Sequence, residues 1–148
     1  MVMLRFTGLS DLAGDIHRMR VNTTQLRPAL KEVAEILAAG QRRQFTTEGR
    51  HYGTPWKKLD PDTIRAKGHS RILENTGRLR RSVAPTNAAG FGVLKITSDS
   101  VEIGTTVPYA GHVHAIRPIV GQPPAADHKA IAETIHRHIT KGTRHARS

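Results

Sequence analysis

The chain contains no cysteine and few aromatic residues. Without thiols it can form neither a disulfide nor a cysteine-ligated zinc site. Aromatic residues make up only 4% of its 148 residues, which argues against the base-stacking surfaces that single-strand binders usually carry. No apolar run approaches the roughly 18 residues needed to span a membrane, and the first residues lack the apolar core of a signal peptide. We therefore expect a soluble chain that is not exported.

Acidic residues are also scarce. Lysine and arginine number 23 against 12 aspartate and glutamate, a formal net charge of +11. Residues 41–81 hold 11 of the basic and 4 of the acidic residues, a net of +7, whereas residues 100–139 hold three of each. A smaller basic excess lies in the tail, residues 140–148. This charge predicts attraction to polyanions or to acidic protein surfaces.

Apolar spacing predicts two main helices. In residues 24–47 apolar residues recur at steps of three and four, which places them on one face of a helix. They are Leu26, Leu30, Val33 and Leu37. Thr23 or Thr24 is expected to cap this helix, with Pro28 in its first turn. A second helix is expected from Ala125 to about Lys141, with a buried stripe of three isoleucines and Gly142 at its end. The stripe is Ile131, Ile135 and Ile139.

Glycine and proline residues mark loops and helix ends in the middle of the chain. Residues 48–59 read as an extended loop, after which Asp60 caps a short helix that begins at Pro61 and ends at Gly68. The later segments 78–85, 90–98 and 100–105 are short, rich in β-branched residues and bounded by turn residues, which predicts strands. Residues 98–100 are expected to form the tight hairpin between the last two.

The predicted class is therefore α+β, with a long N-terminal helix and a C-terminal helix packed on a small antiparallel sheet, and with long Gly/Pro-rich loops. We expect one domain over residues 1–139. Within it, residues 1–22 are expected to form an arm that is flexible or is ordered by a partner. Residues 140–148 form a basic tail.

Histidine pairs raise the question of a metal site. His112 and His114 would share a face if they lay on a strand, and two imidazoles could then bind one metal. His136 and His138 lie in the predicted C-terminal helix, where positions two apart diverge by about 200°. A metal-dependent hydrolase would also need a serine and acidic partners at fixed spacing, which are missing. We favour a wet or interfacial role for these histidines and predict no metal or cofactor.

Other catalytic patterns are missing as well. There is no Gly-x-Ser-x-Gly elbow, and the glycines near residue 90 precede a strand without the Lys-Ser or Lys-Thr of a phosphate-binding loop. The basic middle of the chain lacks a helix-turn-helix, a zinc finger or an aromatic RNA-binding surface. We therefore predict a protein that is not an enzyme. Its arginines bind a protein partner, bind nucleic acid or are solvated. The single tryptophan, Trp56, is expected to fill the edge of the core with its indole N–H bonded to backbone.

An ordered set of residues in the middle of the chain resembles the phage virion morphogenesis family, the tail-completion proteins of tailed bacteriophages. The set is Phe45, Glu48-Gly49, Gly53, Trp56, Leu59, Thr63, Lys67, Ile72-Leu73, Thr76-Gly77, Leu79 and Ser82, followed by "VEIGTTVPYAGHVH" and "RPIVG". The resemblance spans residues 45–139. Ala115 stands where this pattern leads us to expect glycine.

The resemblance implies a structural virion protein that assembles in the host cytoplasm as a ring, with six subunits by analogy, and helps to join tail and head at the neck. Its expected partners are further copies of itself, other neck and tail proteins and DNA in the channel, with no membrane. Expected interface residues are Trp56, Arg71, Arg78, Arg80, Arg81, Tyr109, His112, His114 and Arg117. Expected structural anchors are Leu73 and Leu79, with Gly77 in a turn that needs positive φ. The alternative is a basic module that binds nucleic acid without regard to sequence.

Overall fold

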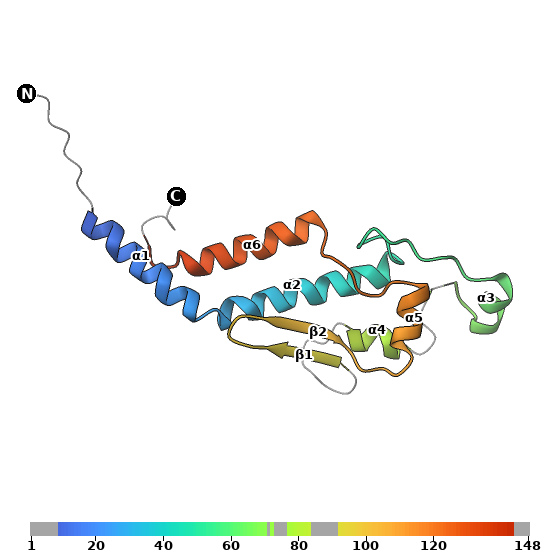
Figure 1. The fold of residues 1–148 in the computed structure, drawn as a ribbon. Helices are drawn as coiled ribbons and strands as arrows, with labels where there is room; N and C mark the ends of the chain where they lie inside the picture. The colour runs from blue at the N-terminus through green and yellow to red at the C-terminus, as the bar shows by residue number, and fades with distance from the viewer. Residues whose placement is uncertain (1–8, 71, 73–76, 84–91, 144–148) are drawn as a thin grey trace, which may run out of the picture.

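The computed structural model describes residues 9–70, 72, 77–83 and 92–143, and its helices and two-stranded antiparallel sheet confirm the α+β class. The molecule is elongated around α2 (Arg27–Thr46) (Figure 1). Helix α6 (Ala125–Ile139) runs along one side of α2, and the hairpin of β1 (Gly92–Ile96) and β2 (Val101–Thr105) runs along the other. No helix among the described residues is both long and apolar enough to cross a bilayer.

Helix α2 forms as its apolar spacing predicts, and Leu30 and Val33 on the predicted stripe are buried. Its predicted start was wrong. The helix begins at Arg27 with Pro28 in its first turn, and no side chain caps it. Thr23 and Thr24 instead end α1 (Leu9–Thr24), where their hydroxyl groups donate to carbonyl oxygens three residues earlier.

Helix α1 occupies most of the segment that the sequence predicted as an arm, and it packs against the C-terminal end of α6. The amide of Asn22 donates to the carbonyl oxygens of Ile139 (2.8 Å) and Lys141 (3.1 Å), and the guanidinium of Arg18 donates to that of Gly142. The last carbonyls of a helix have no partner within the helix. These polar side chains of α1 therefore supply donors to the end of α6.

The predicted hairpin is confirmed. Its register places Leu94 opposite Ile103 and Ile96 opposite Val101, so that one face of the sheet is aliphatic. Helix α2 packs on both strands. The place of the C-terminal helix differs from the prediction, because the principal contacts of α6 are with α2 and α1, and α2 separates α6 from the sheet (Figure 1).

The short helix α3 (Pro61–Lys67) also forms as predicted. The carboxylate of Asp60 accepts a hydrogen bond from the backbone N–H of Asp62 at 2.9 Å. Gly68 ends the helix in the left-handed conformation with φ 76°. Asp60 and Gly68 thus define both ends of α3 through the capping chemistry that their residue types suggest.

The predicted strand over residues 78–85 was wrong, because Arg78–Val83 forms helix α4. Leu79 and Val83 are both buried and lie four residues apart, which places them on one helical face. In a strand, Arg81 would have shared their face. As a helix, α4 keeps Arg81 exposed. Residues 84 and 85 of the predicted strand lie outside the described residues.

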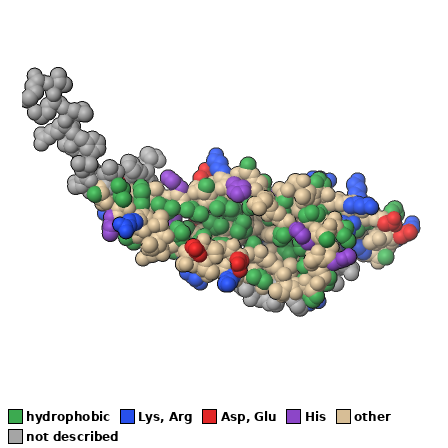
Figure 2. All heavy atoms as spheres, viewed as in Figure 1, with side chains coloured by type: hydrophobic (Ala, Val, Ile, Leu, Met, Phe, Trp, Pro, Cys, Tyr) green, Lys and Arg blue, Asp and Glu red, His purple; other side chains and the backbone are tan. Residues whose placement is uncertain are grey.

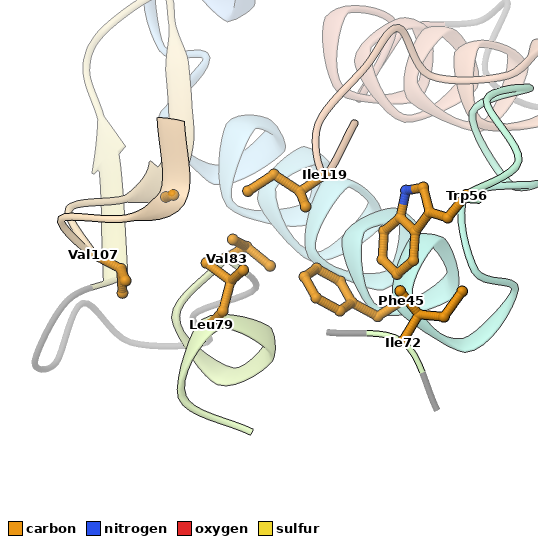
Figure 3. Close-up of a cluster of buried hydrophobic side chains, with 8 residues drawn as sticks. Phe45, Trp56, Ile72, Leu79, Val83, Val107 and Ile119 are labelled. Carbon is orange, nitrogen blue, oxygen red and sulfur yellow. The ribbon is translucent and has the colours of Figure 1, made fainter. Parts of the chain in front are cut away.

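The main hydrophobic core lies where α2, α4 and α5 (Ala110–Ile116) meet the loops before α3 and after α5 (Figure 3). The rings of Phe45 and Trp56 meet edge to face, with centroids 5.2 Å apart and an interplanar angle of 85°. The core side chains are Phe45, Trp56, Ile72, Leu79, Val83, Val107, Ala110 and Ile119. This cluster anchors α4, α5 and the loops beside them, which carry most of the residues expected to bind partners.

Candidate partner-binding surface

A tight turn follows α2 and depends on one glycine. Glu48 and Gly49 have positive φ angles of 49° and 90°. A Cβ atom on Gly49 would lie 2.1 Å from the carbonyl oxygen of Thr54, so only glycine fits without a backbone shift. The backbone N–H of Trp56 donates to the carbonyl of Glu48 at 2.8 Å. The Glu48-Gly49 pair that contributes to the family resemblance is therefore part of the scaffold.

The carbonyl oxygen of Pro118 links the loop after α5 to the end of α2 and to the loop before α3. It accepts hydrogen bonds from the indole Nε1 of Trp56 at 2.7 Å and from Nε2 of Gln44 at 2.8 Å. Gln44 is fully buried, and its Oε1 accepts the backbone N–H of Tyr52 at 3.0 Å. The predicted core role of Trp56 is confirmed. Since Trp56 is only 6% exposed, a partner cannot reach it in this structure.

Two further contacts fix the loop after α5. The Nε of Arg117, which is half-buried, donates to the carbonyl of Lys57 at 3.1 Å. Gly121 lies against the ring of Tyr52, because a Cβ there would come within 3.0 Å of the Tyr52 Cβ. The predicted interface residue Arg117 thus ties its loop to the segment before α3.

His112 and His114 lie on helix α5, so the strand that a shared metal site required does not exist. Both histidines are exposed, and Nδ1 of His114 accepts a hydrogen bond from the backbone N–H of Ile119 at 3.2 Å. No group of three potential metal ligands occurs among the residues that the structure describes. His114 therefore positions the loop that contains the buried Ile119.

Three large apolar side chains are exposed at this end of the molecule. They are Tyr109, 43% exposed, Ile116, 56% exposed, and Val120, 37% exposed. Tyr109 precedes α5, Ile116 ends it, and Val120 follows in the loop that Pro118 fixes. With the exposed His112, they make a surface of mixed apolar and polar character on a rigid support, which is suited to contact with another protein.

Helix α4, whose buried Leu79 and Val83 share the core with Ala110 of α5, carries three of the predicted interface arginines. Leu79 is buried as predicted, and the predicted positive φ of Gly77 is confirmed at 69°. Ser82 Oγ lies 2.7 Å from Thr105 Oγ1, which joins α4 to the end of β2. Arg78 and Arg81 are exposed and Arg80 is half-buried. Arg71, predicted as an interface residue, and Leu73, predicted as a structural anchor, lie outside the described residues.

Basic side chains do not gather in one place on the face shown in Figure 2. Lysine and arginine are scattered around its margins, and hydrophobic side chains run along its middle (Figure 2). Lys57, Lys58 and Arg65 of the basic region 41–81 are exposed, and Arg65 pairs with Asp62. The positive charge is therefore spread over several elements and does not form a single groove on this face.

A buried polar cluster on the other side of α2 was not predicted. Asp127 in the first turn of α6 accepts a hydrogen bond from His51 Nε2 at 2.9 Å and lies 3.6 Å from Arg43 Nη1. Burial, and secondarily the negative charge of Asp127, raise the pKa of Tyr52 from 10.0 to about 12. Gly40 leaves room for the cluster, since a Cβ there would lie 3.1 Å from Asp127 Oδ2. The only sequence signal was the unusual glycine inside a long helix.

Comparisons with known proteins identify the family. The sequence model of the phage virion morphogenesis family matches residues 6–116, which extends from before α1 to the end of α5 and covers most of the chain. Comparison with curated proteins and comparison with solved structures each gave no match. The match begins earlier than the resemblance over residues 45–139 and ends before α6. On this match, and on the ordered motifs that the structure places in one scaffold, the chain belongs to the phage virion morphogenesis family.

Proposed function

We propose that this protein is a tail-completion or head–tail joining subunit, which closes a homo-oligomeric ring at the head-proximal end of a phage tail. Membership of the virion morphogenesis family carries this proposal. It supports a structural role in the virion, and the ring of six subunits is drawn by analogy. The subunit works by stoichiometric assembly and leaves a passage for DNA.

The arrangement of the recognised residues supports an assembly role over a catalytic one. Glu48, Gly49 and Trp56 build a scaffold turn, and Pro118 accepts the hydrogen bonds that fix the loop after α5. The result is a rigid mount for exposed Tyr109 and Ile116. In the proposal these side chains, with His112 and the arginines of α4, face a neighbouring subunit, another neck protein or the DNA.

Phage grown without this protein test the proposal directly. Lysates should accumulate heads and tails that remain separate, and adding the purified protein should join them. Electron microscopy of the lysate counts the three kinds of particle. Normal joined virions in its absence would contradict the proposed role.

The net charge of +11 favours a second candidate, a module that binds nucleic acid without sequence preference. Neutralising several phosphates would release counterions and make the affinity fall steeply with salt. Titration of duplex DNA at a series of salt concentrations distinguishes the two. Micromolar affinity of a monomer with a steep slope, together with normal virions in the lysate experiment, would favour the second candidate.

A further inference from the structure

The outward side of helix α5 is apolar and has no formal charge. Tyr109 and Ile116 are seven positions apart, which places them on the same side of the helix. They are 43% and 56% exposed. Residues 109–116 contain no lysine, arginine, aspartate or glutamate. We call this side the α5 face, and its exposed residues are Tyr109, Gly111, His112, Ala115 and Ile116.

The isoleucine stripe of α6 is half-buried, which corrects the prediction that it would be buried. The residues that α6 buries are Asp127 and Thr134, both polar. At 100° per residue, Arg137 is turned about 60° to one side of Thr134 and Ile131 about 60° to the other. The Arg137 side faces Glu32 of α2, whose Oε2 lies 2.8 Å from Arg137 Nη2. The opposite side, which we call the α6 flank, consists of Ile131, Ala132, Ile135 and Ile139.

The α6 flank is unusual for a helix on the surface of a protein. Such a helix normally turns its apolar stripe toward the core. On α6 the polar Asp127 and Thr134 occupy the centre of the contact instead, and the isoleucines remain partly exposed beside them. The exposed Ala132 extends the same uncharged side. The α6 flank is therefore an aliphatic surface that α2 covers incompletely.

The lack of charge on both surfaces favours a second copy of the chain as the partner. Two copies that each carry a net charge of +11 repel each other. Contact between them is least opposed where neither side has a lysine or an arginine, and burial of apolar area then stabilises it. DNA or an acidic protein would instead be attracted to the basic surfaces of the molecule.

The two surfaces also match in length. Tyr109 to Ile116 spans about 10 Å of helix and Ile131 to Ile139 about 12 Å. A Cβ on Gly111 would meet nothing within 4 Å, so another helix can approach α5 closely. Helix α5 lies near the C-terminal end of α2, whereas α6 runs along the side of α2 (Figure 1). Because the α5 face is exposed, the α6 flank that it would cover belongs to another molecule.

We propose that the α5 face of one copy packs on the α6 flank of the next copy, with Tyr109 and Ile116 covering the half-buried isoleucines. The contact rests on the proposed ring and deepens it. Because the two surfaces differ, the contact is head-to-tail. Repetition of a head-to-tail contact closes a ring when the rotation is suitable.

Cross-linking tests the contact in the full-length protein, because the chain has no native cysteine. Ile116→Cys and Ala132→Cys each place one thiol at an exposed position of one surface. In a mixture of the two variants, one of which carries a size tag, a short bismaleimide should join one chain of each kind. This mixed product should exceed the same-variant products several-fold, and the double variant should give a ladder of oligomers. Lys31→Cys, at an exposed α2 position, replaces Ala132→Cys in the control and should give no mixed product.

A lysine on the α5 face provides a second test. Ile116→Lys should weaken self-association about tenfold, as measured by light scattering over a concentration series, because it places a charge in an apolar contact. Ile16→Lys on α1 is the matched control, since Ile16 is 54% exposed, and it should assemble as the wild type does. Circular dichroism identifies misfolding of either lysine variant, in which case the cysteine variants decide.

The outcomes separate this contact from the proposed function. Wild-type rings that give no mixed product, or that give same-variant products in equal yield, would overturn the contact and leave the ring standing. Self-association of Ile116→Lys at wild-type strength would also overturn it. So would a protein that stays monomeric at every concentration and gives no mixed product. The lysate experiment judges the virion role independently.

Discussion

His51 Nε2 and Asp127 Oδ2 lie 2.9 Å apart, although 76 positions separate the two residues in the chain. This hydrogen bond joins the turn after α2 to the first turn of α6, where a carboxylate is also favoured by the helix dipole. Since α6 begins beyond the end of the family match, the bond connects the family scaffold to the C-terminal helix.

Replacing Asp127 by alanine should lower the free energy of unfolding by about 1–3 kcal/mol, because the part-buried imidazole of His51 loses its acceptor and the exposed guanidinium of Arg43 loses its ion-pair partner. Urea unfolding followed by the fluorescence of Trp56, the only tryptophan, measures the change. Asp62→Ala provides the control, since Asp62 takes part in an exposed ion pair with Arg65 whose loss should cost less than about 1 kcal/mol. If both variants lose the same unfolding free energy, the cluster around Asp127 contributes no more than an exposed ion pair, which would contradict the prediction.

Gly40 and Gly14 form a matched pair for alanine substitution in helices. Alanine is favoured over glycine by about 0.8–1 kcal/mol in a helix interior, and Gly14 has nothing within 4 Å of its would-be Cβ, so Gly14→Ala should stabilise the protein. At Gly40 the Cβ would crowd Asp127 Oδ2 at 3.1 Å and the Tyr52 hydroxyl at 3.3 Å. Gly40→Ala should therefore destabilise it. Thermal unfolding of both variants provides the comparison, and stabilisation by Gly40→Ala would refute the crowding.

Alanine substitutions at Gly49 and Gly53 distinguish the effect of a steric clash from that of backbone strain. Both have positive φ, 90° and 72°, so alanine at either should cost about 1–2 kcal/mol of strain. Only Gly49 has a close neighbour, the Thr54 carbonyl at 2.1 Å from the added Cβ. Gly49→Ala should thus lose far more stability than Gly53→Ala and shift the emission of Trp56. If denaturant unfolding shows similar losses of stability in both variants, the turn after α2 adjusts to the added Cβ atom at little cost, and the prediction is wrong.

The pKa of Tyr52 is raised by burial and by Asp127 from 10.0 to about 12. Between these values the folded protein holds a proton that the unfolded chain has lost. Stability from this group is therefore complete below pH 10 and falls as the pH rises toward 12. Tyr52→Phe should reduce this loss relative to the wild type in unfolding experiments. In a Tyr109→Phe background, tyrosinate absorbance should report Tyr52 alone, and a midpoint near 10 would contradict the shift.

Local patterns predicted the elements whose determinants lie close together in the chain. The apolar spacing of α2, the Asp60 cap of α3 and the alternation of the hairpin each involve neighbours within a few residues. Helix α4 was mistaken for a strand because the segment is short and is bounded by turn residues. Six residues with three arginines carry too little periodicity to reveal the helical spacing of Leu79 and Val83. Short apolar runs allow both readings.

The scaffold contacts were harder to foresee because their partners are far apart. Burial of Trp56 and its bond to backbone follow from the chemistry of indole, but the acceptor at Pro118 lies 62 residues away. The same holds for Asp127, whose partners His51 and Arg43 come from another helix and turn. No local rule connects such residues, and only the packed fold shows that Gly40 leaves space for the side chain of Asp127.

The shared acceptor at Pro118 lies just beyond Ile116, the last residue of the family match. A chain cut at that boundary would retain Gln44 and Trp56 but lose the oxygen to which both donate. Each abandoned donor would cost about 1–3 kcal/mol in a small protein with little stability to spare. We therefore expect that residues 6–116, the segment matched by the family model, do not fold stably alone. A polypeptide that ends at residue 116 should be degraded or insoluble when expressed.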